Sequence, residues 1–157
     1  MATAPSMAPS IRIKRVFQAP REKVFAAWTE KEQVEQWRLK ASPELMTKTL
    51  EFDVREGGRH VIEVRLPNGA HQVNRSTYKT VKRPERLVFT YEWEQFDATG
   101  KKTGEMTGTV VTVDFHERGR TTEVVLLHEF FPNEEQRNAH NGGWNAVLDL
   151  LERMLAA

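Results

Sequence analysis

Three side chains in this sequence are candidates for acid–base chemistry in a binding site. His128 and His140 are imidazoles, which exchange protons near neutral pH, and Tyr91 carries a phenol, which donates hydrogen bonds. All three fall on faces that we expect to point inward, and His128 and His140 can meet across a gap between a strand and the last helix. They are our candidates for a general acid or base, or for hydrogen bonding to a ligand.

A structural role is the alternative for these residues, because buried polar groups are usually hydrogen-bonded within the protein. No metal site is predicted, since zinc needs three or four converging ligands and the histidines lack such spacing. The sequence contains no cysteine, which excludes disulfides, thiolate nucleophiles and cysteine metal sites. It also has no nucleophile elbow, glycine-rich phosphate loop or HExxH motif. We therefore expect neither a metal nor a cofactor.

A set of apolar side chains, most of them aromatic, recurs with strand or helix spacing and can line a cavity for an apolar ligand. A solid core is the alternative, because such stripes are usually core. Gly142 and Gly143 add to the cavity interpretation, since two glycines inside a helix cost about 1–2 kcal/mol relative to alanine. The predicted lining residues are Trp37, Phe52, Ile62, Val64, Phe89, Tyr91, Trp93, Val111, Val113, Leu126, His128, His140, Trp144 and Leu148.

One long helix must form a wall of this site. It is expected to follow Pro132, with Asn133 as its N-cap, and to run for about 23 residues to Ala157. Its apolar residues recur at spacings of three and four, which predicts one buried stripe that needs a broad partner surface. The stripe consists of Trp144, Val147, Leu148, Leu151, Met154 and Leu155.

The residues before this helix predict strands that supply the partner surface. Apolar and basic residues alternate over 11–17, which predicts a first strand. A short helix follows Pro20, and a capping box at 29–32 is expected to open a second one, which ends at 41–43. Period-two alternation then dominates, with 97–104 as a polar loop. The inward faces are expected at 50–54, 60–66, 87–93, 109–115 and 124–130, and a strand of weaker alternation is expected at 71–82.

Short turns join most of these strands, so neighbours in sequence should pair antiparallel. The order predicts an α+β fold in which a curved antiparallel sheet of six to seven strands wraps around the long C-terminal helix. Two short helices follow the first strand. Residues 11–157 are expected to form a single domain, preceded by a flexible tail at 1–10.

Composition limits the functional classes. The net charge is +1, which gives no general attraction to nucleic acid. No window approaches the roughly 18 apolar residues of a membrane span, and the first residues lack the features of a signal peptide. A cysteine-free chain fits most simply in the reducing cytoplasm.

Several short segments, in this order, resemble the Hsp90-ATPase-activator-like branch of the START-like, or SRPBCC, superfamily. The resemblance implies a helix-grip fold, also called Bet v 1-like, with an elongated cavity between sheet and helix. In that superfamily the cavity often holds lipids, sterols or polyketides, and some members are cyclases. The matching segments are 19–20, 24–25, Trp28, Trp37, 53–58, Tyr78, 83–89, 91–93, 122–128 and 140–144.

Three functional hypotheses follow. The first is a module that binds a small hydrophobic or amphipathic molecule in the cavity. The second, implied by the resemblance, is a protein-interaction module that stimulates an Hsp90-like chaperone. The third is a cavity enzyme, a cyclase or hydrolase, that uses His128, Tyr91 or His140 as acid or base. We expect a monomer or a weak homodimer.

Overall fold

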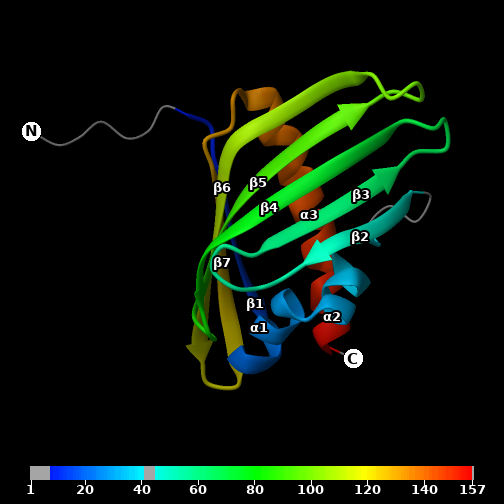
Figure 1. The fold of residues 1–157 in the computed structure, drawn as a ribbon. Coiled ribbons are helices and arrows are strands. Elements are labelled where there is room, and N and C mark those ends of the chain that lie inside the picture. The colour runs from blue at the N-terminus through cyan, green and yellow to red at the C-terminus, as the bar shows by residue number, and fades with distance from the viewer. Residues whose placement is uncertain (1–7, 41–44, 157) are drawn as a thin grey trace, which may run out of the picture.

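The computed structural model describes residues 8–40 and 45–156. Seven strands form one antiparallel sheet in the order β1-β7-β6-β5-β4-β3-β2, and a long helix lies across it (Figure 1). This is the helix-grip fold, so the predicted fold class is confirmed. The elements are β1 (Ile11–Phe17), α1 (Arg21–Thr29), α2 (Lys31–Trp37), β2 (Met46–Phe52), β3 (Arg59–Arg65), β4 (His71–Lys82), β5 (Arg86–Phe96), β6 (Lys102–Arg118), β7 (Thr121–Glu129) and α3 (Glu134–Ala156).

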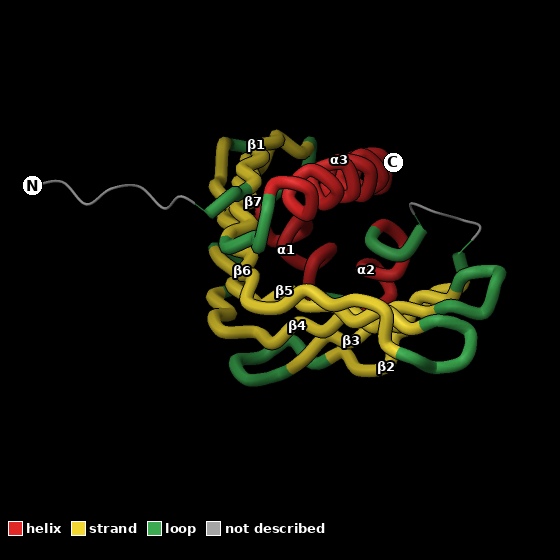
Figure 2. The backbone as a smooth tube through the Cα atoms, turned by 90° about the horizontal axis from the view of Figure 1, so that it is seen from above, coloured by secondary structure: helices red, strands yellow, loops and turns green. Residues whose placement is uncertain are grey.

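The sheet bends around α3. Seen from above, β1 and β7 form one wall, β2 to β5 form the other, and α1 and α2 lie in the angle between them (Figure 2). The pairing of β5 with β6 shifts register between Tyr91 and Trp93, and β4 shifts against β5 between Tyr78 and Thr80. Such bulges bend a strand and increase its twist, which lets long strands curve around a helix.

The long helix begins as predicted. The Asn133 side chain accepts a hydrogen bond from the Gln136 backbone N–H at 2.9 Å, which satisfies one of the free donors of the first turn. Trp144, Leu148 and Leu151 are buried against the sheet, together with Leu155 in the last turn. The predicted apolar stripe therefore faces the sheet.

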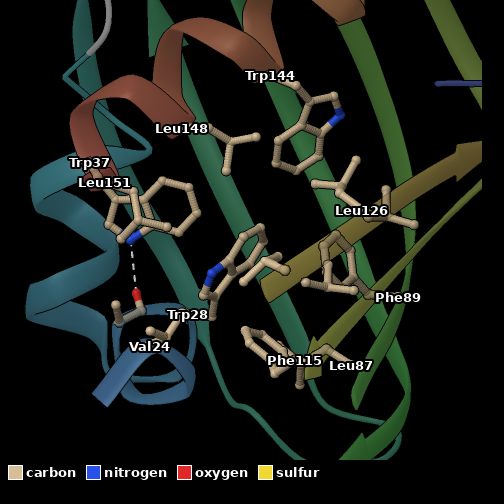
Figure 3. Packing of buried hydrophobic residues seen from close by; sticks show 14 of the residues in the cluster. Val24, Trp28, Trp37, Leu87, Phe89, Phe115, Leu126, Trp144, Leu148 and Leu151 are labelled. Carbon is tan, nitrogen blue, oxygen red and sulfur yellow. Dashed lines mark hydrogen bonds between the residues drawn. The ribbon is translucent and has the colours of Figure 1, made fainter. Parts of the chain in front are cut away.

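A dense core joins the two short helices to the sheet and α3 (Figure 3). The rings of Trp28 and Trp37 meet edge to face at 4.7 Å, and Trp28 also stacks on Trp144 at 6.2 Å. The buried Trp37 indole N–H donates to the Ala27 carbonyl at 2.8 Å, drawn as a dashed line in Figure 3. This bond satisfies the one polar group that Trp37 brings into the core.

The capping box predicted for the second short helix is wrong. The Thr29 hydroxyl donates to the carbonyl oxygen four residues earlier, within α1, so it does not cap α2. Glu30 occupies the N-cap position of α2 without a side-chain bond to the backbone. The helix ends at Trp37, and the predicted end at 41–43 falls outside the described residues.

Three side chains expected to face inward are exposed to solvent instead, and one of them, Leu66, follows the last residue of β3. Leu50 lies at a register shift in β2 and is 46% exposed. Phe130 follows the end of β7 with a φ of 70°, and its exposed ring is replaced in the core by Phe131. The polar loop expected over 97–104 is shorter, because β6 begins at Lys102.

The first described residues are attached to the sheet–helix corner. The Pro9 carbonyl accepts from the Phe131 N–H at 3.4 Å, and the Ser10 carbonyl accepts from Arg137 Nε at 2.8 Å. Of the tail predicted over 1–10, residues 1–7 lie outside the described part of the chain.

Candidate functional site

A cavity of about 510 Å³ lies between the first half of α3, the end of α2 and the concave face of β2 to β5. This volume is within the range of known small-molecule sites. Gln95, Ala139 and Gly143 are exposed lining residues, so the cavity opens to solvent between β5 and α3. Its lining consists of Arg38, Leu39, Leu45, Thr47, Ile62, Val64, Gln72, Asn74, Tyr91, Trp93, Gln95, Gln136, Ala139, His140, Gly143, Trp144 and Val147.

The structure divides the predicted lining residues into two groups. Six of them line the cavity: Ile62, Val64, Tyr91, Trp93, His140 and Trp144. The other eight pack elsewhere, most of them deep in the core: Trp37, Phe52, Phe89, Val111, Val113, Leu126, His128 and Leu148. The core therefore occupies the end of the sheet–helix gap near α1, and the cavity occupies the end near β2 and β3.

Sequence reasoning missed the polar part of the lining. Gln72 and Asn74 on β4 lie on the same face as Tyr78, and Asn74 pairs opposite both Ile62 and Trp93. Polar residues on an inward face weaken the period-two pattern, so β4 gave only a weak signal. The weak alternation of β4 was itself informative, because a partly polar cavity requires a strand whose inward face carries amide side chains.

These amides form a chain of hydrogen bonds across the cavity floor. Gln95 donates to Gln72 at 3.0 Å, Gln72 donates to Asn74 at 2.7 Å, and Asn74 donates to the Tyr91 hydroxyl at 3.5 Å. Each amide thereby holds its neighbour in one orientation. The chain presents a polar strip on an otherwise largely apolar surface.

Tyr91 lies at the inner end of this chain. Its ring contacts those of His128, His140 and Trp144, with centroid separations of 5.0, 5.7 and 6.0 Å. Burial raises the pKa of its phenol, an effect that the positive charge of Arg38 and the Asn74 hydrogen bond oppose. The hydroxyl accepts from Asn74, and no acceptor for its own hydrogen is found among the described residues. It can therefore donate to a molecule in the cavity.

His128 lies behind the cavity wall with both ring nitrogens occupied. The Trp144 indole N–H donates to Nδ1 at 3.0 Å, and Nε2 lies 2.9 Å from the Thr109 hydroxyl. That hydroxyl donates to the Tyr91 carbonyl, so it must accept from His128, which places the proton on Nε2. Burial, with nearby His140 and Arg38, lowers the pKa of His128 to about 3. This geometry favours a role in holding Trp144 in place.

His140 is also neutral and bonded on both sides. Its Nδ1 lies 2.7 Å from the Gln136 carbonyl and therefore carries the proton, while Nε2 accepts from the Trp93 indole N–H at 3.3 Å. Burial lowers the pKa of His140, and the bond to Gln136 opposes this shift. Its ring is half-buried and forms part of the cavity wall. Both candidate histidines thus orient tryptophans.

Among the described residues of the lining, Arg38 alone carries a full charge. It follows the last residue of α2, where a cation suits the negative end of the helix dipole. Its guanidinium carbon lies 5.5 Å from the ring centre of Trp144 and 5.9 Å from that of Phe89. Its positive charge adds to the effect of burial in lowering the pKa of His60 to about 3. Because Arg38 directly follows Trp37, at the end of the helix, no periodicity in the sequence predicts that it lines the cavity.

Residues 8–40 and 45–156 contain neither a candidate metal site nor a membrane-spanning helix. No group of three or more residues able to hold a metal ion occurs in these ranges. No helix among them is long and apolar enough to cross a membrane.

Solved structures with low sequence identity share this fold. A protein from Chromobacterium violaceum is 21% identical with a TM-score of 0.76, and the match covers 94% of this chain and 98% of that one. An AHSA1 protein from Silicibacter pomeroyi is 20% identical with a TM-score of 0.73, covering 94% and 98%. CalU16 from Micromonospora echinospora is 22% identical with a TM-score of 0.62, covering 94% and 76%. No curated protein matches the chain.

A family match identifies the branch of this fold. The sequence profile described as "Activator of Hsp90 ATPase homolog 1-like protein" matches residues 18–156. This span contains α1, α2, α3 and every strand except β1. The chain therefore belongs to the Activator of Hsp90 ATPase homolog 1-like family, within the START-like superfamily.

Proposed function

We propose that this protein binds one small hydrophobic or amphipathic molecule in the cavity between the sheet and α3. The observation that carries this proposal is the cavity itself, about 510 Å³ in volume. An apolar surface is provided by Trp93, Trp144, Ile62, Val64 and Val147. The hydrogen-bonded amides on β4 and β5 provide polar contacts in fixed positions. Known ligand sites combine these two kinds of surface.

The geometry supports binding more than catalysis. A general acid or base needs a nitrogen or oxygen that can reach the substrate proton. His128 and His140 use both ring nitrogens for bonds within the protein. Tyr91 retains a free hydroxyl hydrogen, but burial raises the pKa of its phenol, so it serves as a hydrogen-bond donor rather than as a base.

Native mass spectrometry of the purified protein tests this proposal. We expect a mass above that of the bare chain, and organic extraction should release an apolar molecule in equimolar amount. A bare-chain mass, together with tryptophan emission unchanged by a panel of lipids and aromatic acids, would count against the proposal. Trp93 and Trp144 make the second readout direct, since both line the cavity.

A second function is supported by the family match alone. The family is described by its likeness to an activator of the Hsp90 ATPase, which suggests a chaperone as partner. In that case the protein would form a complex with Hsp90 and raise its rate of ATP hydrolysis. An unchanged rate at saturating protein would remove this alternative and leave ligand binding unaffected.

A further inference from the structure

We infer that Arg38 binds the anionic head group of the ligand, so that the cavity selects an apolar molecule carrying one carboxylate. This inference rests on the proposed ligand-binding function and names its chemical class. It is carried by three features of the described residues: the charge of the lining, the free donors of Arg38 and Tyr91, and the apolar surface beside them.

The charge of the lining is unbalanced. Of the described residues that line the cavity, Arg38 is the only cation, His140 is neutral, and none is an aspartate or a glutamate. Several arginines of the sheet lie beside carboxylates; Arg86 Nε, for example, is 2.6 Å from Asp114. Arg38 has no carboxylate within ion-pair distance in the described part of the chain. The described part of the lining therefore presents one uncompensated positive charge.

Arg38 is held by ring contacts that leave its hydrogen-bond donors free. A guanidinium has five N–H groups, and none of those of Arg38 donates to a described residue. The Phe89 and Trp144 rings attract the cation but do not satisfy these donors. A partly buried charge without a counter-ion is costly, and a carboxylate offsets that cost with two parallel charge-assisted bonds.

The Tyr91 hydroxyl is a second free donor in the same cavity. The Trp144 ring links the two groups, lying 6.0 Å from the Tyr91 ring and 5.5 Å from the Arg38 guanidinium carbon. Asn74 donates to the Tyr91 oxygen, which leaves the phenol hydrogen for an acceptor on the ligand. A phenol and a guanidinium together suit an anion and disfavour a cation.

The rest of the lining fits an apolar body. Leu39, Leu45, Ile62, Val64 and Val147 are aliphatic and belong to the same cavity as Arg38. A purely polar anion would leave this surface in contact with water, whereas a hydrocarbon or aromatic body would bury it. The ligand class is therefore an amphipathic acid rather than a free inorganic anion.

The test compares three ligands that share one hydrocarbon chain: decanoate, decan-1-ol and decylamine. Isothermal titration calorimetry at about pH 8 keeps the acid ionised and the amine protonated. The variants are Arg38→Met, which keeps an unbranched chain without charge, and Arg38→Lys, which keeps the charge without the planar fork. Arg153→Met is the matched control, because Arg153 is exposed on α3 beyond the lining residues.

We expect the wild type to bind decanoate about tenfold or more tightly than decan-1-ol, and decylamine least tightly. Arg38→Met should bind the acid and the alcohol about equally, Arg38→Lys should keep part of the preference, and Arg153→Met should match the wild type. Equal binding of acid and alcohol by the wild type would overturn the inference and leave the ligand-binding function standing. An undiminished preference in a folded Arg38→Met would also overturn it. Binding of none of the three would contradict both proposals.

Discussion

At the scale of single residues, the histidines of the core are most informative. The sequence indicated that His128 and His140 point inward and meet, and their rings lie 5.9 Å apart. It could not indicate their partners, because hydrogen bonding depends on contacts between β5, β6, β7 and α3 that period-two alternation does not encode. The sequence did not predict that Arg38 lines the cavity, because a charged residue directly after a helix usually faces solvent.

Burial of two neutral histidines makes stability depend on pH. The pKa of His60 and that of His128 are lowered from 6.5 to about 3, chiefly by burial. Below about pH 6.5 the unfolded chain takes up protons that the folded chain does not, so the free energy of unfolding falls as pH falls towards 3. Each histidine should contribute a slope of about 1.4 kcal/mol per pH unit.

Urea unfolding between about pH 7.5 and pH 4.5 measures this slope. His128→Gln removes one of the two groups, so the slope should fall by about 1.4 kcal/mol per pH unit. The free energy of unfolding at neutral pH should also fall by about 1–3 kcal/mol, because the buried hydrogen-bond partners of His128 would be poorly satisfied by glutamine. His116→Gln, at an exposed position, should leave the slope unchanged. A slope unaffected by His128→Gln would show that His128 is protonated in the folded protein.

At the scale of elements, the sequence predicted helices and strands well and their irregularities poorly. The stripe from Trp144 to Leu155 placed α3 correctly, because helical periodicity directly reports a buried face. Leu50 and Phe130 were placed on the wrong face, because a register shift or a positive φ reverses the side on which the next residues lie. Alternation along one strand does not show where its partner shifts.

Two glycines give a paired prediction at this scale. A Cβ on Gly142 in α3 would meet no atom within 4 Å, so Gly142→Ala should stabilise the fold by about 1 kcal/mol. A Cβ on Gly58 would lie 2.1 Å from the Asp53 carbonyl oxygen, so Gly58→Ala should destabilise it by about 2 kcal/mol or more. Urea unfolding of both variants checks these signs. A loss of stability in Gly142→Ala would indicate that α3 needs a glycine for a bend.

At the scale of the whole molecule, the sheet and α3 together enclose more space than the core fills. The sequence predicted which strands face α3, and six predicted lining residues do border the cavity. It could not predict where packing stops, because core and cavity walls share the same apolar alternation. Phe89 and Val111 show the same apolar alternation as Tyr91 and Trp93, yet both are buried in the core and neither lines this cavity.

Titration with the neutral fluorescent probe N-phenyl-1-naphthylamine tests the central claim most directly. The wild type should raise probe emission to a plateau at one probe per chain. Val64→Trp places a large ring in the cavity and should weaken binding by about tenfold or more, since Val64 is part of its lining. Val16→Trp makes the same change at an exposed position on β1 and should bind as the wild type does. No plateau in the wild type, or equal binding in a folded Val64→Trp, would contradict the account.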